Sequence, residues 1–116
     1  MKFPIFIENS KLPKFLSFFA PINIKAITIG PIVFSDGEMS DVTKNHERIH
    51  WEQYKELYII GFLFLYLYYW LIGLFKYKSG SLSYFSIPFE REAYDNHENM
   101  NYIYTRKKNG WHKYIN

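Results

Sequence analysis

The sequence predicts an α+β fold that is mostly helical. A β-branched and partly alternating run over residues 24–34 favours a strand. Residues 41–78 favour a long helix that is polar in its first half and almost wholly apolar in its second. Pro88 suits the first turn of a final helix over 88–107. A chain of 116 residues has the size of one domain, so we expect a single domain over 1–116.

Residues 1–23 are expected to form an arm that packs on the domain. Pro4, Pro13 and Pro21 each remove a backbone donor and disfavour a long helix. Pro4 and Glu8 also interrupt the first apolar run before it reaches the roughly 7–15 residues of a signal core. We therefore expect no cleaved secretory signal in this stretch.

Local signals predict the boundaries of the other elements. Pro31 places the predicted strand at a sheet edge or breaks it there, because proline cannot donate to a strand ladder. Ser40 or Asp41 is expected to cap the long helix. Residues 79–86, which are rich in serine, favour a loop, and residues 108–116 favour an exposed tail.

The composition excludes several classes of protein. Phe, Trp and Tyr make up 22% of the residues, which excludes a disordered chain, because such chains lack the apolar surface that offsets the entropy of ordering. The absence of cysteine excludes a disulfide scaffold and any thiolate metal site, so a metal would need His and carboxylate ligands. The net charge of +3 is too small to indicate nucleic acid as a partner.

The clearest chemical signal is the H-E-x-x-H motif His46-Glu47-Arg48-Ile49-His50. Histidines four residues apart on a helix project from one face, so both imidazoles can bind one metal ion. A zinc ion in such a site takes three protein ligands and a water. Glu47 lies where it can accept the proton of that water as general base and pass it on as general acid. The alternative is a solvated, charged helix face with two ordinary histidines.

A third ligand is expected from the start of the final helix, where the carboxylates of Glu90 and Glu92 both qualify. With this second helix the chain resembles the gluzincin metallopeptidases, in which the H-E-x-x-H helix is followed by a helix that supplies a Glu ligand. Some gluzincins carry E-x-x-A-D there, and Glu90-Arg91-Glu92-Ala93-Tyr94 is similar, with Tyr94 in place of Asp. The resemblance implies that Glu90 is the ligand and Glu92 the alternative.

A closer resemblance covers residues 27–114 and is to short, uncharacterised bacterial and phage-type proteins. These proteins carry an N-H-E-x-I-H-x-x-Q helix, which residues 45–53 match, and an F-E-R-E-A-Y-x-N helix, which residues 89–96 match. The resemblance implies a minimal gluzincin-like domain that binds one Zn²⁺ ion. Gln53 belongs to that pattern, and Asp95 can orient a histidine if the helix turns it toward the site.

Other residues are weaker candidates. Several polar side chains could stabilise an oxyanion: His97, His112, Tyr94, Tyr102 and Arg106. Each of them is more simply interpreted as a packing or surface residue. The basic cluster Arg106-Lys107-Lys108, with Lys113 and Trp111, can touch phosphate or anionic lipid, but such a run is more often a solvated tail. In gluzincins an edge strand beside the active-site helix aligns an extended peptide, and residues 27–34 fit either that role or an ordinary core strand.

The apolar half of the long helix presents two alternatives. Residues 57–75 form a run of 19 residues without charge, about 28 Å long as a helix, which matches a membrane span. A single span, however, would separate His50 from Glu90 by about 30 Å. We therefore expect the run to be mostly core. A break at Gly61 or Gly73 would shorten the path by which the chain returns to the site. The remaining face of the run is available to a membrane surface or a homo-oligomer.

Two functions follow from these patterns. The first is a zinc-dependent metallopeptidase that hydrolyses a peptide or protein substrate, with His46, His50 and Glu90 as ligands and Glu47 as catalytic residue. The alternative is a membrane-associated interaction protein, single-pass or interfacial, with a non-catalytic metal motif. The first is expected in the cytoplasm or peripheral to a membrane, and the second includes a single-pass membrane protein.

Overall fold

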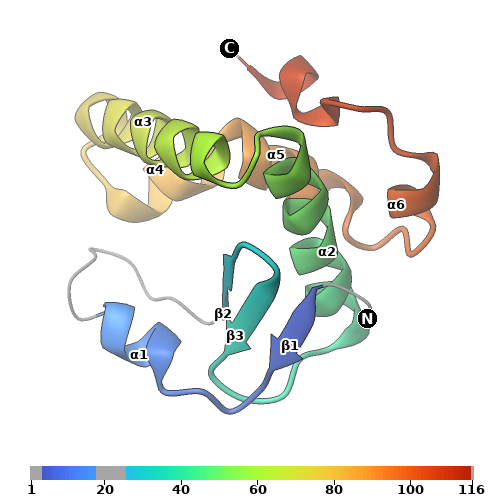
Figure 1. Ribbon diagram of the computed structural model, residues 1–116. Coiled ribbons are helices and arrows are strands. Elements are labelled where there is room, and N and C mark those ends of the chain that lie inside the picture. Colours follow the sequence, from blue (N-terminus) through green and yellow to red (C-terminus); the bar gives the residue numbers. More distant parts are fainter. Residues whose placement is uncertain (1–3, 18–25, 116) are drawn as a thin grey trace.

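The computed structural model describes residues 4–17 and 26–115 and confirms the α+β, mostly helical fold (Figure 1). In Figure 1 the small sheet lies below the helices of the second half of the chain, and the helix that follows the sheet in the sequence runs beside it and connects the two parts. In chain order the elements are β1 (Ile5–Ile7), α1 (Leu12–Ser17), β2 (Ala26–Ile29), β3 (Ile32–Ser35), α2 (Asp41–Glu56), α3 (Ile60–Tyr77), α4 (Gly80–Ser86), α5 (Pro88–Asn96), α6 (Tyr102–Thr105) and the 3₁₀ helix η1 (Gly110–Tyr114).

The sheet has the strand order β1-β3-β2, with β1 parallel and β2 antiparallel to the central strand β3. The predicted strand over 24–34 is therefore a hairpin, and its first two residues lie outside the described part of the chain. The turn falls at Gly30, whose φ of 58° a glycine adopts without strain. Pro31 breaks the strand, one of the two outcomes that its missing N–H predicts, and β2 is left at the sheet edge.

The predicted long helix is divided into α2 and α3 by a sharp bend at Tyr58 and Ile59. These residues have φ of 56° and 64°, and the Ile60 N–H donates to the Tyr58 carbonyl at 2.6 Å, which closes a three-residue turn. Positive φ is unfavourable for a β-branched residue, so tertiary contacts must hold this bend. The bend therefore precedes Gly61 and Gly73, the two positions at which a break was considered, and both glycines lie inside α3.

α3 packs along α4, and their closest approach is at Gly73. A Cβ atom at this position would lie 2.3 Å from the Ser83 hydroxyl oxygen, so only glycine permits the contact. The loop expected over 79–86 is wrong, since the Ser79 side chain accepts a hydrogen bond from the Leu82 N–H at 3.2 Å and starts α4. Serine capping thus explains a serine-rich segment that the sequence suggested was irregular.

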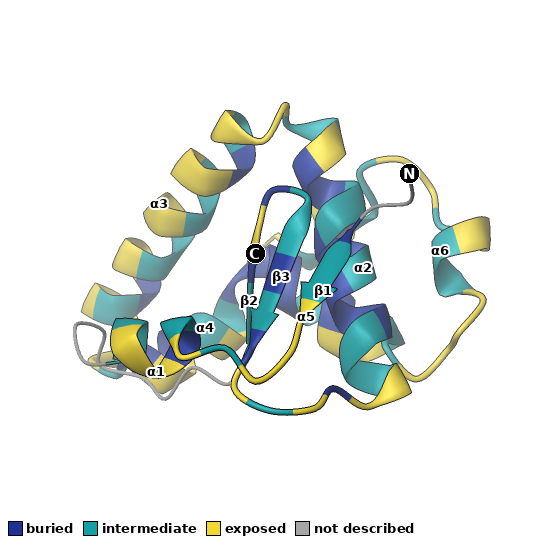
Figure 2. Ribbon diagram, turned by 60° about the horizontal axis from the view of Figure 1, so that its bottom comes forward, coloured by how far each residue is buried: buried dark blue, intermediate teal, exposed yellow. Residues whose placement is uncertain are grey.

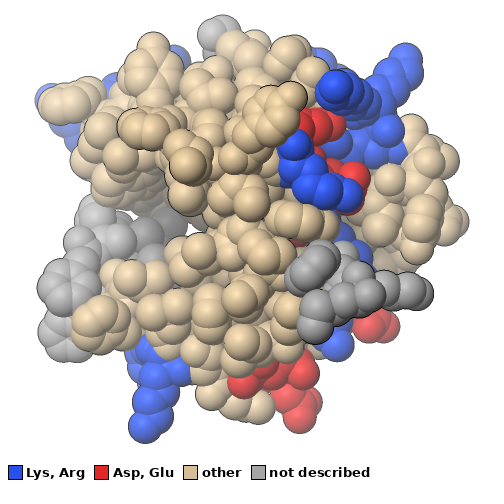
Figure 3. All heavy atoms as spheres, viewed as in Figure 1, with Lys and Arg blue, Asp and Glu red and all other residues tan. Residues whose placement is uncertain are grey.

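The expectation that the apolar run is mostly core is wrong. Only Phe62 and Gly73 of α3 are buried, and the outer face of the helix is exposed (Figure 2). Among the described residues, α3 packs mainly against α4 and at its start against α2, which leaves its outer side uncovered. In Figure 3 the surface over α3 is uncharged, apart from basic side chains at its left end, where the helix carries Lys76 and is capped by Lys78.

The C-terminal part of the chain returns to the core. α5 ends at Asn96 and is followed by the short α6, so the predicted helix over 88–107 is interrupted. The expected exposed tail over 108–116 is wrong at Trp111 in η1, which is 4% exposed and whose ring lies 4.7 Å from the Phe89 ring. Other residues of this segment are exposed, as expected: Lys108, His112, Lys113 and Ile115. The remainder of this aromatic core comes from α2, α3 and the start of α5: Tyr54, Phe62 and Ile87. In the arm expected over 1–23, the described residues form β1 and α1.

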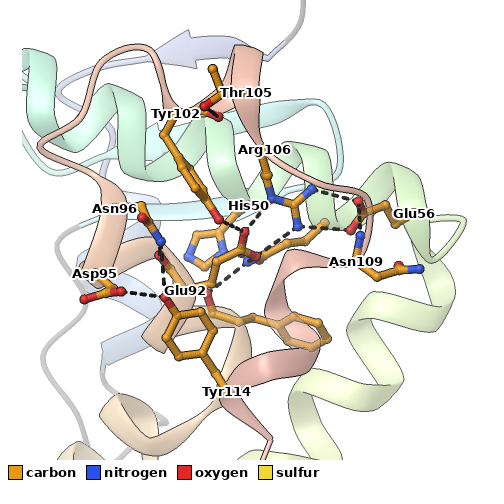
Figure 4. Close-up of polar contacts among 12 residues, drawn as sticks. His50, Glu56, Glu92, Asp95, Asn96, Tyr102, Thr105, Arg106, Asn109 and Tyr114 are labelled. Carbon is orange, nitrogen blue, oxygen red and sulfur yellow. Dashed lines mark hydrogen bonds and ion pairs between the residues drawn. The ribbon is translucent and has the colours of Figure 1, made fainter.

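Arg106 holds this C-terminal part in place through two carboxylates. Its guanidinium donates to Glu56 at 2.7 Å and to Glu92 at 2.5 Å, and its side chain is 4% exposed (Figure 4). The Tyr102 hydroxyl donates to Glu92 at 2.6 Å, and the Asn109 N–H donates to Glu56 at 2.7 Å. Burial disfavours the charge on Glu92, but the hydrogen bonds from Arg106 and Tyr102 hold its pKa below the usual value.

We expect Arg106→Gln to lower the free energy of unfolding by about 3–5 kcal/mol, because it leaves the buried Glu92 and the largely buried Glu56 without a cationic partner. Urea denaturation followed by circular dichroism measures the loss. Lys107→Gln, which removes an exposed charge at the next position, is the control and should change the stability by less than about 0.5 kcal/mol. Equal stability of the two variants would contradict the role given to Arg106.

Candidate metal centre

His46, Glu47 and His50 lie together on the buried face of α2. All three are buried, with exposed fractions of 4–6%. The helix places the two histidines one turn apart, and their rings meet edge to face with centroids 4.9 Å apart. The alternative of a solvated, charged helix face is therefore wrong for these residues.

The side chain of Glu90 reaches the two histidines from the first turn of α5. Its Oε1 atom lies 3.0 Å from Nε2 of His46 and 3.0 Å from Nε2 of His50. One ligand atom from each of the three residues lies within 4.8 Å of the others, so the group could hold a metal ion. Bonds of about 2.0–2.2 Å to a tetrahedral ion place ligand atoms roughly 3.3–3.6 Å apart. The Oε1–Nε2 distances of 3.0 Å are shorter than this, so the carboxylate would move slightly away from the rings to admit an ion.

Gln53 orients His50. The Gln53 amide donates to the Phe89 carbonyl at 3.0 Å and to Glu92 at 2.9 Å, so its oxygen is left to accept from Nδ1 of His50 at 2.8 Å. A proton on Nδ1 leaves the lone pair of Nε2 directed at Glu90 and the candidate ion position. Figure 4 shows how Glu92 and Arg106 continue this chain of hydrogen bonds away from His50.

His97 orients the other histidine. Its Nδ1 atom lies 3.0 Å from Nδ1 of His46. Burial, followed by the neighbouring His46, lowers the pKa of His97, which favours a neutral ring that can accept a proton from His46. Asn45 fixes the segment that carries His97, because its amide donates to the carbonyls of His97 at 2.8 Å and Asn99 at 3.0 Å.

Tyr66 on α3 binds the second oxygen of Glu90. Its hydroxyl donates to Oε2 at 2.7 Å, so that only Oε1 faces the histidines. Burial and the nearby Glu90 carboxylate raise the pKa of Tyr66, and the hydroxyl therefore keeps its proton at neutral pH. This contact joins α3 to the site, and the sequence analysis did not identify it.

The electrostatics of the group are dominated by Glu90. Burial disfavours the charged form of His50, but Glu90 overcomes that effect and raises the pKa of His50 to about 9. Burial also opposes the charge on Glu90, yet His50 and His46 hold its pKa well below the ordinary value. A proton and a metal ion therefore compete for Nε2 of His50.

Glu47 is held by the sheet. Its Oε2 atom accepts a hydrogen bond from the Thr28 hydroxyl on the edge strand β2. The Tyr54 hydroxyl, one helical turn beyond His50, donates to the Thr28 carbonyl at 2.6 Å and joins the same strand to α2. The Glu47 carboxylate is thus fixed beside the His–His–Glu group by the sheet.

A groove of about 770 Å³ opens on Glu47 and the His–His–Glu group. β2 forms one wall, and α3 and α4 form the other. The α3–α4 wall is largely apolar and includes Phe62, Leu67, Trp70 and Phe85. The group therefore lies at the polar base of a groove large enough for a ligand.

The structure separates the remaining predicted site residues. Glu92 binds Arg106 and Gln53, so of the two carboxylates only Glu90 belongs to the group. Asp95 is exposed and accepts from the Tyr114 hydroxyl at 2.5 Å instead of orienting a histidine (Figure 4). The Tyr94 ring lies 4.5 Å from the His46 ring and lines the groove.

Of the weaker candidates, only His97 and Tyr94 lie beside the group. Tyr102 and Arg106 are bound to Glu92, and the His112 ring packs on Trp111 in η1 with centroids 4.2 Å apart. The residues that sequence reasoning missed are Thr28 and Tyr66. Tyr66 follows the buried Phe62 by one helical turn, a weak signal that both face inward.

No protein-family model, curated protein or solved structure matches this chain.

We expect Glu90→Gln to weaken the binding of a divalent ion by at least about a hundredfold, because the group loses its anionic ligand. Dialysis against Zn²⁺ followed by metal analysis measures the change. Asp95→Asn is the matched control, since it alters an exposed carboxylate on the same helix and should bind metal as the unmodified chain does. Tight binding by Glu90→Gln would show that the ion is held elsewhere.

Metal binding should release a proton. With the pKa of His50 at about 9, the ring is protonated at neutral pH, so the apparent affinity is expected to rise about tenfold per pH unit between pH 6 and 8 and to level off above pH 9. Calorimetric titration with Zn²⁺ in buffers of different ionisation enthalpy counts the protons. An affinity that does not change over this range would contradict the competition at His50.

Proposed function

We propose that this chain is a zinc-dependent metallopeptidase in which His46, His50 and Glu90 hold the ion. The observation that carries the proposal is the position of Glu90 Oε1, 3.0 Å from both Nε2 atoms, with Glu47 buried on the same helix face. Two imidazoles and one carboxylate are the donor set of open, catalytic zinc sites. Zinc bound there lowers the pKa of a water to about 7 and polarises the carbonyl of the substrate.

Glu47 is the general base and then the general acid of this proposal. It follows His46 directly, lies at the groove, and is held by Thr28. From this position its carboxylate can accept a proton from the attacking water and deliver it to the leaving amine. Orientation of His50 by Gln53 and of His46 by His97 supports a catalytic group more than an accidental one, because each ring keeps Nε2 directed at the group.

A peptide or protein is the proposed substrate. β2 is a sheet edge and lines the groove through all four of its residues. The Thr28 carbonyl already accepts from Tyr54, so the pairing with an extended peptide would use the other main-chain groups of this edge. The opposite wall, formed by α3 and α4, is apolar and suits hydrophobic side chains of that peptide.

A second candidate function is a membrane-associated interaction protein whose metal group is not catalytic. The observation that favours it is the exposed apolar surface of α3. The first candidate hydrolyses peptides and needs the Glu47 carboxylate to do so, whereas the second hydrolyses none. Peptide cleavage by the unmodified chain and by a Glu47 variant therefore distinguishes them.

We expect the purified chain to contain about one zinc ion and to cleave members of a library of internally quenched peptides. Glu47→Gln should reduce cleavage by at least about a hundredfold and leave the zinc content unchanged, because it removes the proton acceptor but no ligand. Glu52→Gln, the same change on the same helix outside the groove, should cleave as the unmodified chain does.

Two results would contradict the peptidase proposal. One is a zinc-loaded chain that cleaves no peptide in the library, which would favour the second candidate. The other is cleavage that Glu47→Gln leaves intact, which would assign the activity to another group or to a contaminant.

A further inference from the structure

The outward side of α3 is a continuous apolar surface. Its large side chains recur at spacings of three and four residues, and their exposed fractions run from 41% to 82%. We refer to the following eight residues as the apolar face of α3: Ile60, Leu63, Phe64, Leu67, Tyr68, Leu71, Ile72 and Phe75. The outer side of α4 adds the exposed Leu82 and Phe85.

The apolar face of α3 is larger than a soluble monomer ordinarily exposes. Eight large side chains, each about half exposed, present on the order of 600 Å² or more, at or above the largest patch of a typical monomer. Within the described part of the chain, α3 is also the one helix that has the length and apolar composition to cross a membrane. Such a surface indicates a partner.

The charges around this face indicate an anionic partner. Between residues 57 and 89 the sequence contains no Asp or Glu, and its only charged residues are Lys76 and Lys78. Both lysines are exposed at the end of α3, beside the uncharged surface in Figure 3. Apolar side chains next to cations, without acids, are typical of helices that lie in the interface of an anionic bilayer.

The tyrosines distinguish a lipid surface from a second copy of the chain. Tyr58 is 89% exposed and Tyr68 is 56% exposed, and Tyr77 follows at the far end of the helix at 38%. In a dry interface between two copies, such hydroxyls would be buried without partners, whereas at the level of the lipid headgroups the ring and the hydroxyl are both satisfied.

The helix is positioned to lie on the bilayer and not to cross it. His46 and His50 precede α3, Glu90 follows it, and the three side chains meet in one group. Tyr66 binds Glu90, and α4 packs back along α3 through Gly73, so the inner side of the helix is occupied by protein. Only the outer side is available to lipid.

We propose that the apolar face of α3 docks on an anionic lipid bilayer, with the helix parallel to the membrane and Lys76 and Lys78 against the headgroups. The proposal does not depend on the peptidase activity, since six of the eight residues of this face do not line the groove. Leu63 and Leu67 belong both to this face and to the wall of the groove, so the groove opens next to the lipid surface.

Sedimentation of the full-length chain with vesicles tests the docking. We expect the chain to bind vesicles of phosphatidylcholine with 30% phosphatidylserine, and more weakly those of phosphatidylcholine alone. The double variant Phe64→Ser and Phe75→Ser should bind at least about tenfold more weakly, because two exposed rings that enter the interface are lost. The double variant Lys76→Gln and Lys78→Gln should lose roughly tenfold or more at low salt.

Tyr104→Ser is the control, because Tyr104 is 80% exposed in α6 and should not touch the bilayer. Unchanged zinc content and circular dichroism verify that each variant is folded, so a failure of docking is distinguishable from a failure of the metal site. The proposal is overturned if the chain does not bind anionic vesicles, or if the phenylalanine double variant binds them as tightly as the unmodified chain does. It is also overturned if lipid-free chains form a dimer that Phe64→Ser and Phe75→Ser dissociate.

Discussion

The contact of one carboxylate oxygen, Glu90 Oε1, with both His46 and His50 determines how the parts of this chain are arranged. It brings the first turn of α5 against the buried face of α2, although 40 residues separate Glu90 from His50. The apolar segment between them must therefore leave α2 and return within the same structure. Tyr66 binds the other oxygen of Glu90 and positions α3 by the same carboxylate. An electrostatic contact thus constrains a segment whose own composition is almost wholly apolar.

Around this contact, the polar residues form a chain that extends far beyond the candidate metal ligands. Gln53 joins His50 to Glu92, and Glu92 joins Gln53 to Arg106, which also binds Glu56 at the end of α2 (Figure 4). A buried network of this kind is stable only when its members are all paired, because an unpaired charge in a low dielectric is costly. The orientation of His50 consequently depends on a residue, Arg106, that lies outside the groove and reaches no part of the group directly.

Much of the fold and the site could be predicted from local patterns. The spacing of His46 and His50 and the carboxylate of Glu90 each belong to a short local motif of the sequence. The structure brings the two motifs together. The function of Tyr66, Thr28 and Arg106 could not be predicted, because each acts through a partner distant in the sequence. The apolar run was wrongly expected to be core, since hydrophobicity predicts that a helix needs cover but not which elements pack against it. The loop expected over 79–86 failed for a related reason: capping by Ser79 and contact with Gly73 outweigh a serine-rich composition.

The bend at Tyr58 and Ile59 has a consequence for the relation between the metal group and the apolar face of α3. Neither residue is glycine, so the strain of two successive positive φ angles is offset by contacts made further along the helix. These are the stacking of Phe62 on Tyr54, with centroids 3.9 Å apart, and the bond from Tyr66 to Glu90. An ion that fixed Glu90 would therefore also stabilise the bent backbone, and its binding would be coupled to the angle at which α3 leaves α2.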